Sequence, residues 1–257
     1  MKVPVCSIKL LPEDQWIDAA FTASRINPAN APAQSTLAMV APDLVIAPEH
    51  LALLTAKYWG SGGVRLTVGF LDGPAADLRA RILSHMNAWG AFCNVQFTET
   101  ATNPQVRIAR TAGDGYWSYL GTDILRIAAN KPTMNLDSFT MSTADSEFHR
   151  VIRHETGHTL GFPHEHLRKE IVNRIDRAKA IQYFETTQGW SEAQVVAQVL
   201  TPLDDSALIK TAQSDIHSIM CYWLPALIMT DNVAVDGGTD IDSLDAQFAS
   251  GVYPKLN

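Results

Sequence analysis

The chain has 257 residues and a formal net charge of −7, with 46% hydrophobic and 18% charged residues. This length and composition are those of a globular protein with one large domain or two small ones. The acidic balance argues against a nucleic-acid-binding surface, and no apolar run approaches the roughly 20 residues of a membrane span. The three cysteines permit at most one disulfide, which excludes a disulfide-stapled scaffold; they are Cys6, Cys93 and Cys221.

The first 57 residues differ from the rest of the chain. Residues 1–9 lack a long apolar segment and are not a Sec-type signal peptide, so export by another route, a signal already removed and an internal location all stay open. An amphipathic segment at 13–25 precedes an Ala- and Pro-rich stretch at 27–48, which we expect to be an extended connector. Pro48 then suits the first turn of a short helix that ends near Lys57.

The next part of the chain alternates strand and helix patterns. Residues 64–70 alternate apolar and polar side chains with the period of a strand, and residues 74–91 keep apolar side chains at helical spacing. Further strands are expected at 95–98, 106–110, 116–120 and 124–128, and an edge strand or irregular rim at 133–141. The order of strand, helix and strand predicts one βαβ crossover.

Helices are expected over most of the remaining chain. Ser142 and Asp145 resemble a capping box at the start of a helix. The side chains that this helix would bury are Phe148, Val151, Ile152 and Leu160. Later helices are expected to begin near Asp176, at Ser191 and near Asp242, the last one continuing to Val252.

One motif in this region has the spacing of metal-binding residues. Residues 154–164 read H-E-T-G-H-T-L-G-F-P-H, which has the form H-E-x-x-H-x-x-G-x-x-H. His154 and His158 are four residues apart, so a helix places both on one face. A catalytic zinc ion takes neutral imidazole nitrogens at about 2.0–2.1 Å and keeps a position open for water. The pattern therefore predicts a zinc site.

The residues between the histidines fit the same chemistry. Glu155 follows the first ligand and can act as general base at the open position. Gly161 can end the helix in a left-handed conformation and return the chain, so that His164 reaches the same metal.

A second segment extends the pattern into a family resemblance. The motif continues as Glu165-His166-Leu167-Arg168, and Ser218-Ile219-Met220-Cys221-Tyr222 follows much later. Together these resemble the signature and the Met-turn of the astacin branch of the metzincin zinc peptidases. Trp117-Ser118-Tyr119-Leu120-Gly121 and Trp59-Gly60-Ser61-Gly62-Gly63-Val64 are also similar to that family's sheet segments. The resemblance covers roughly residues 58–254.

The resemblance implies an α+β metzincin fold. A twisted mixed sheet with two long helices would form the N-terminal subdomain, and an irregular, mostly helical C-terminal subdomain would follow a break near Gly161, with the zinc in the cleft between them. It implies that Glu155 is the general base and that Tyr222 stabilises the oxyanion. Met220 would lie beneath the metal and Glu165 would be structural. The implied zinc ligands are His154, His158 and His164.

Some features depart from the family. Astacins carry two disulfides, whereas Cys93 and Cys221 are expected here to be buried free thiols. Residues 1–57 are interpreted as an N-terminal extension, either a retained pro-segment or a wrap-around arm, before a catalytic domain at 58–257. Cys6 could be an inhibitory zinc ligand within this extension. The alternatives are a free surface thiol or a disulfide with Cys93 or Cys221.

The other histidines are not assigned to the zinc site. His166 lies two residues past the third ligand and is expected to point elsewhere if the chain is extended there. The remaining ones are expected to be surface or satisfied structural residues; they are His50, His85, His149 and His217.

The expected function is that of a monomeric zinc endopeptidase with one catalytic Zn²⁺ and protein or peptide substrates. Its location stays open, with secretion suggested by the family resemblance. Two alternatives stay open. One is a non-peptidase zinc hydrolase, such as an amidase on a small substrate. The other is a latent or binding protein whose zinc is blocked by the N-terminal segment.

Overall fold

The computed structural model describes residues 6–31, 55–202 and 214–255. Most of the connector expected at 27–48 and most of the helix expected at 48–57 lie outside these ranges. Residues 55–57 are not helical.

A six-stranded mixed sheet forms the framework, in the order β1-β5-β6-β4-β2-β3. β5 and β6 are antiparallel, whereas every other neighbouring pair is parallel. The predicted crossover is confirmed, because β2 and β3 pair in parallel on either side of helix α4 in the sequence. The strands are β1 Cys6–Lys9, β2 Val64–Phe70, β3 Val95–Glu99, β4 Val106–Ala109, β5 Tyr116–Tyr119 and β6 Met134–Leu136.

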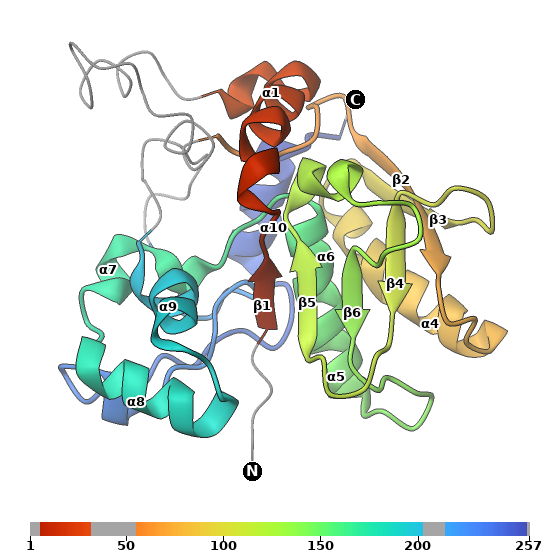
Figure 1. The fold of residues 1–257 in the computed structure, drawn as a ribbon. Helices are drawn as coiled ribbons and strands as arrows, with labels where there is room; N and C mark the ends of the chain where they lie inside the picture. The colour runs from red at the N-terminus through yellow and green to blue at the C-terminus, as the bar shows by residue number, and fades with distance from the viewer. Residues whose placement is uncertain (1–5, 32–54, 203–213, 256–257) are drawn as a thin grey trace.

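Strand β1 was not predicted, and it comes from the N-terminal arm. It pairs in parallel with β5, with Cys6 opposite Tyr116 and Lys9 opposite Tyr119 (Figure 1). The Lys9 ammonium also lies 4.4 Å from the centroid of the Trp117 ring. The arm therefore covers the outer edge of β5, which would otherwise end the sheet.

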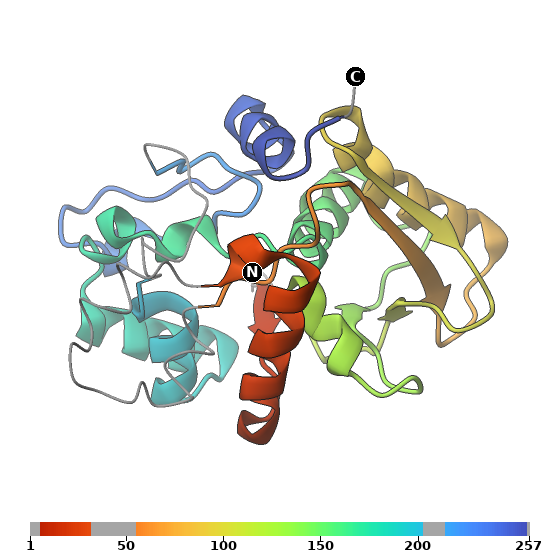
Figure 2. The same ribbon diagram turned by 90° about the horizontal axis from the view of Figure 1, so that it is seen from above.

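Helices cover one face of the sheet and alternate with loops in the second half of the chain. Figure 1 shows α4 and α6 behind the sheet and α7, α8 and α9 on the far side of β1; Figure 2 gives the view from above. The helices are α1 Trp16–Ile26, α4 Ala76–Met86, α5 Asp145–Glu147, α6 Arg153–Thr159, α7 Lys169–Val172, α8 Arg177–Gln188, α9 Glu192–Val195 and α10 Ser243–Val252. A π-helical turn at Phe148–Ile152 joins α5 to α6. We call the continuous stretch 145–159 the motif helix.

Helix starts were predicted well where a side chain caps the backbone. Asp176, Ser191 and Asp242 are the N-caps of α8, α9 and α10, and each accepts a hydrogen bond from the first turn. The Ser142 prediction was wrong, because the motif helix begins after Ala144 without a side-chain cap. Ser142 Oγ instead contacts Thr140 Oγ1.

Two strand predictions also need correction. Residues 124–128 are not a strand: a 3₁₀ helix occupies Gly121–Arg126. Gly121 has a φ of 47°, and the Lys57 carbonyl accepts the Thr122 N–H at 3.0 Å, so the chain turns there instead of extending. β6 lies between β5 and β4, inside the sheet, and is not the edge that 133–141 suggested.

The helix expected at 74–91 ends at Met86 and continues as a 3₁₀ turn at Asn87–Ala91.

Two hydrophobic clusters fill the interior of the described residues. The first packs the sheet against α4, the motif helix and α10 and includes Ile82, Trp89 and Phe162. The second lies among α8, α9 and the later loops and includes Phe184 and Leu224. Cys6 from β1 belongs to this second cluster.

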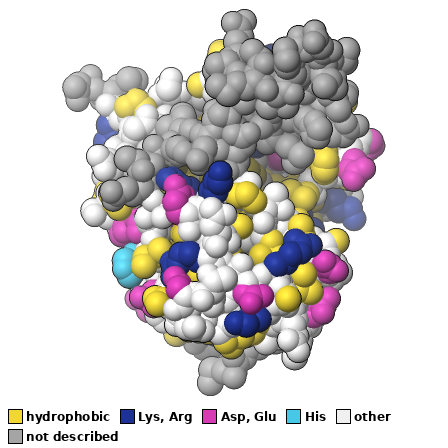
Figure 3. All heavy atoms as spheres, turned by 90° about the vertical axis from the view of Figure 1, so that its left-hand side faces the viewer, with side chains coloured by type: hydrophobic (Ala, Val, Ile, Leu, Met, Phe, Trp, Pro, Cys, Tyr) yellow, Lys and Arg dark blue, Asp and Glu magenta, His cyan; other side chains and the backbone are white. Residues whose placement is uncertain are grey.

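The surface that carries α8 and α9 bears basic and acidic side chains side by side (Figure 3). Among the described residues no helix combines the length and the apolar character needed to cross a membrane.

Gly161 ends the motif helix as predicted, with a φ of 94°. A Cβ at this position would lie 2.9 Å from the Lys57 carbonyl oxygen, so both the backbone conformation and the available space require glycine. We expect Gly161→Ala to lower the free energy of unfolding by about 1–3 kcal/mol. Urea unfolding of the zinc-loaded protein measures this.

The matched control is Gly251→Ala in α10, where a Cβ would meet no atom of the described residues within 4 Å. It should leave stability unchanged or raise it, because alanine is the better helix former. A loss below about 0.5 kcal/mol for Gly161→Ala would contradict the strain argument.

Candidate metal centre

The three motif histidines converge in the structure. The ring centroids of His154 and His158, one helical turn apart, are separated by 4.7 Å. After the reversal at Gly161, the His164 ring lies 4.4 Å from His158 and 5.3 Å from His154. All three side chains are buried.

Backbone carbonyls set the protonation of two of these rings. His154 Nδ1–H donates to Ile219 O at 2.6 Å, and His158 Nδ1–H donates to Phe162 O at 2.8 Å. Because a carbonyl only accepts, each Nδ1 carries the proton and each Nε2 keeps its lone pair. Burial lowers the pKa of His154 to about 4 and the pKa values of His158 and His164 well below their usual range, so the rings are neutral at pH 7.

The ligand nitrogens of the three rings lie close together, within 4.8 Å of one another. His154 Nε2 is buried and has no hydrogen-bond partner among the described residues. His158 Nε2 and His164 Nε2 are 2.9 Å apart. Buried nitrogen atoms without partners cost free energy, and a cation at their centre removes that cost. Three neutral imidazoles are also the ligand set of many catalytic zinc ions, so these residues fit zinc.

Cys6 joins this group from the N-terminal arm. One ligand atom from each of Cys6, His154, His158 and His164 lies within 4.8 Å of all the others. Cys6 is unpaired and 6% exposed, so neither the surface thiol nor the disulfide alternative was correct. Burial raises the pKa of its thiol well above the usual value, with Glu155 adding to the shift. A bound metal cation would reverse this preference and favour the thiolate. Cys93 and Cys221 are buried and free, as expected.

Glu155 is completely buried next to the histidines. Neither of its carboxylate oxygens has a hydrogen-bond partner among the described residues. Burial raises the pKa of Glu155 to about 8, against the opposing effects of the Cys6 thiol and the Arg150 guanidinium. The group is therefore mainly protonated at pH 7 in the metal-free site, and a bound cation would favour the carboxylate that a general base needs.

Tyr222 lies against the same cluster. Its ring is 4.3 Å from the His164 ring and stacks on His166 at 4.0 Å, and its hydroxyl has no hydrogen-bond partner among the described residues. His166 is not part of the four-residue metal group, but it is fully buried, with Nε2 2.9 Å from Gln198 O. Sequence spacing gave no sign of this stacking, because it joins His166 to Tyr222 in a segment distant in the sequence.

Met220 packs against the motif helix, and Glu165 follows the third histidine in the chain. A Cβ on Gly157 of the motif helix would be 2.4 Å from Met220 Sδ, so the methionine packs directly against the helix. The Glu165 N–H donates to Met220 O at 2.9 Å, and Glu165 Oε1 accepts the Asp215 N–H at 3.0 Å. Glu165 thus connects the loop after the motif to the Met220 segment.

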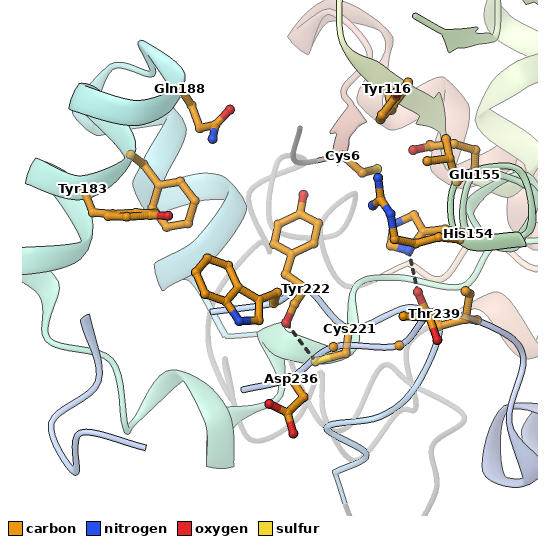
Figure 4. A pocket seen from close by; sticks show the side chains of 17 residues that line it. Cys6, Tyr116, His154, Glu155, Tyr183, Gln188, Cys221, Tyr222, Asp236 and Thr239 are labelled. Carbon is orange, nitrogen blue, oxygen red and sulfur yellow. Dashed lines mark hydrogen bonds between the residues drawn. The ribbon is translucent and has the colours of Figure 1, made fainter. Parts of the chain in front are cut away.

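A cavity of about 200 Å³ opens beside this centre. Figure 4 shows Cys6, His154 and Glu155 on one side of it and Tyr183 and Gln188 of α8 on the other. Further lining residues are Tyr116, Arg150, Tyr222, Trp223 and Thr239. Sequence analysis did not identify Tyr183, Gln188 or Trp223, because segments distant in the sequence bring them to the cavity.

Comparisons with known proteins agree with this geometry. The sequence model of the astacin peptidase family matches residues 55–226. The chain belongs to the astacin family. The resemblance seen in the motifs is therefore confirmed, and so are the α+β metzincin fold and the classification as a zinc metallopeptidase.

Solved structures show the same fold. The structure of myroilysin superimposes with a TM-score of 0.73 at 32% identity, covering 78% of this chain and 97% of that one. High choriolytic enzyme 1, a hatching enzyme zinc-protease from the medaka fish Oryzias latipes, gives a TM-score of 0.53 at 19% identity over 78% of this chain and 96% of that one, which supports the fold alone. Zinc metalloproteinase nas-27 of Caenorhabditis elegans is 33% identical over 91 residues, which span 35% of this chain and 19% of that relative.

The convergence makes a prediction about metal retention. We expect the protein to keep one tightly bound zinc ion through dialysis against a weak chelator. His164→Ala should lose most of the zinc, because fewer ligands remain and one coordination position of the metal has lost its imidazole. Elemental analysis of the dialysed proteins measures the zinc content.

His217→Ala is the control, because His217 is exposed and lies outside the group. It should keep the full zinc content. An unchanged zinc content in His164→Ala would exclude His164 as a ligand.

Proposed function

We propose that the chain is a zinc-dependent endopeptidase in which His154, His158 and His164 hold the metal and Glu155 is the general base. The observation that carries the proposal is the convergence of three buried neutral imidazoles beside a buried carboxylate. Zinc, when bound, would lower the pKa of a water molecule towards about 7 and polarise the scissile carbonyl. Family membership favours this function over a non-peptidase hydrolase.

Side chains of the protein would transfer the protons and donate a hydrogen bond to the oxyanion. The Glu155 carboxylate, whose oxygens have no hydrogen-bond partner in the described part of the chain, accepts the proton of the attacking water and delivers it to the leaving amine. The Tyr222 hydroxyl, which has no hydrogen-bond partner among the described residues, can donate to the developing oxyanion, and its ring packs against those of His164 and His166. Met220 supports the motif helix from below, and Glu165 fixes the loop that carries His164.

The proposed substrate is an extended protein or peptide chain that pairs with β5. The backbone groups of an edge strand give affinity with little dependence on sequence. In this structure β1 already occupies that edge. The same arm therefore competes with a substrate for β5.

We further propose that residues 1–57 keep the enzyme latent and that Cys6 is the inhibitory zinc ligand. Cys6 stands with the three histidines, where its thiolate would take the position that water needs. The arm is also fixed to the domain: Gln198 bonds to both backbone groups of Ile8, at 3.2 and 3.1 Å, and the Asn30 side chain bonds to both backbone groups of Tyr58. In this proposal residues 58–257 form the catalytic domain, with its subdomain break near Gly161.

Glu155→Gln tests the general base. In a Cys6→Ala background, we expect the change to keep the fold and the zinc content and to lower kcat by about 10²–10⁴, because the amide cannot accept the water proton. Cleavage of a quenched fluorescent peptide library measures the rate.

Glu192→Gln is the matched control, since Glu192 is exposed and distant from the site. It should cleave at the rate of its parent. A Glu155→Gln rate within tenfold of the parent would mean that another group activates the water.

Cys6→Ala tests latency in the full chain. We expect peptidase activity to rise while the zinc content stays at one equivalent, because the metal loses its fourth protein ligand but keeps three. Peptide cleavage and elemental analysis on the same sample measure both quantities.

Cys93→Ala removes a different buried thiol and should leave activity unchanged. If Cys6→Ala has the activity of the wild-type chain, the thiol has no part in latency.

A further inference from the structure

We propose that His85, Asp145 and His149 form a second divalent-metal site, weaker than the first and suited to zinc. One ligand atom from each lies within 4.8 Å of the other two. None of the three belongs to the catalytic group or lines the cavity beside it. Sequence analysis treated both histidines as surface or satisfied residues.

Two rigid elements bring these side chains together. Asp145 and His149 are four residues apart at the start of the motif helix, so they lie on one helical face. His85 is in the last turn of α4, and its ring lies 4.9 Å from the His149 ring at an interplanar angle of 69°. The His85 ring also packs on Phe148 at 5.4 Å. The donor atoms are therefore positioned by helix packing.

The hydrogen bonds around these three residues leave one potential metal-ligating atom of each side chain available. Asp240 Oδ2 accepts His149 Nδ1–H at 2.8 Å, which leaves the lone pair on Nε2, 3.6 Å from Asp145 Oδ2. A carboxylate behind a ligating imidazole is the usual outer partner in metal sites. Arg81 binds Asp145 through Oδ1 and leaves Oδ2 available. His85 Nδ1 is buried and has no hydrogen-bond partner among the described residues, so this histidine is not satisfied by the protein.

The distances suit a tetrahedral ion. Ligands at about 2.0–2.2 Å from zinc stand about 3.4 Å from one another, close to the His149–Asp145 separation. His85 needs a shift of no more than about 1.5 Å. Two imidazoles and a carboxylate are a ligand set that zinc accepts, with water at the fourth position. Asp145 is 70% exposed, so an ion has access from solvent.

Nearby charges explain why this site is the weaker one. Asp145 and Asp240 are already paired with Arg81 and Arg153. A divalent cation therefore adds net positive charge to a partly exposed cluster, whereas the first site is buried and has four donors. A bound ion would connect α4 to the start of the helix that carries His154.

Zinc binding to the full chain, with the tight site already filled, tests this site. Isothermal titration of Zn²⁺ alone into protein that holds one zinc ion should reveal a second equivalent. Asp145→Asn keeps the shape of the side chain, and His85→Phe keeps a ring against Phe148, but each removes a donor. Each variant should weaken the second equivalent at least tenfold and keep the first.

His217→Ala should bind the second equivalent like the wild type. Wild-type protein that takes up no second equivalent would overturn the proposal, as would a second equivalent bound equally well by Asp145→Asn and His85→Phe. Asp145 is exposed, so Asp145→Asn should fold, and its zinc binding tests the proposal even if His85→Phe fails to fold. Because the readout is binding with the first site filled, the result does not depend on the proposed peptidase activity.

Discussion

The structure depends on keeping three imidazole nitrogens together away from water. His154 Nε2 has no protein partner among the described residues, and His158 and His164 face each other across 2.9 Å. Such an arrangement is costly unless the surrounding protein holds the rings and a cation joins them. The carbonyls of Ile219 and Phe162 hold two rings by Nδ1, and the left-handed turn at Gly161 returns the third.

The N-terminal arm is coupled to the same centre through several elements. β1 extends the sheet at β5 and brings Cys6 to the histidines. On its other side, Gln198 binds the Ile8 backbone through its side chain, and its carbonyl oxygen lies 2.9 Å from His166 Nε2. His166 in turn stacks on Tyr222. Displacing the arm would therefore change the surroundings of both the metal position and the proposed oxyanion donor.

The sequence predicted those parts of the fold that depend on interactions between residues close together in the chain. The period of residues 64–70, the capping side chain of Asp242 and the glycine at 161 each act within a few residues, and the structure agrees with all three. Residues 121–126 turn because of a contact with Lys57, and β1 forms because β5 has a free edge. Those contacts join distant segments, so no window of sequence contains them. For the same reason the motif identified the three histidines, whereas the stacking of His166 and the His85 cluster became visible only in three dimensions.

The central claim is that the N-terminal thiol closes a three-histidine zinc site. Zinc K-edge X-ray absorption on the full chain loaded with one equivalent of zinc measures the ligands directly. The account predicts one sulfur ligand at about 2.3 Å and three nitrogen ligands at about 2.0–2.1 Å, with the sulfur replaced by a light atom in Cys6→Ala. A spectrum without sulfur, or one unchanged in Cys6→Ala, would contradict it.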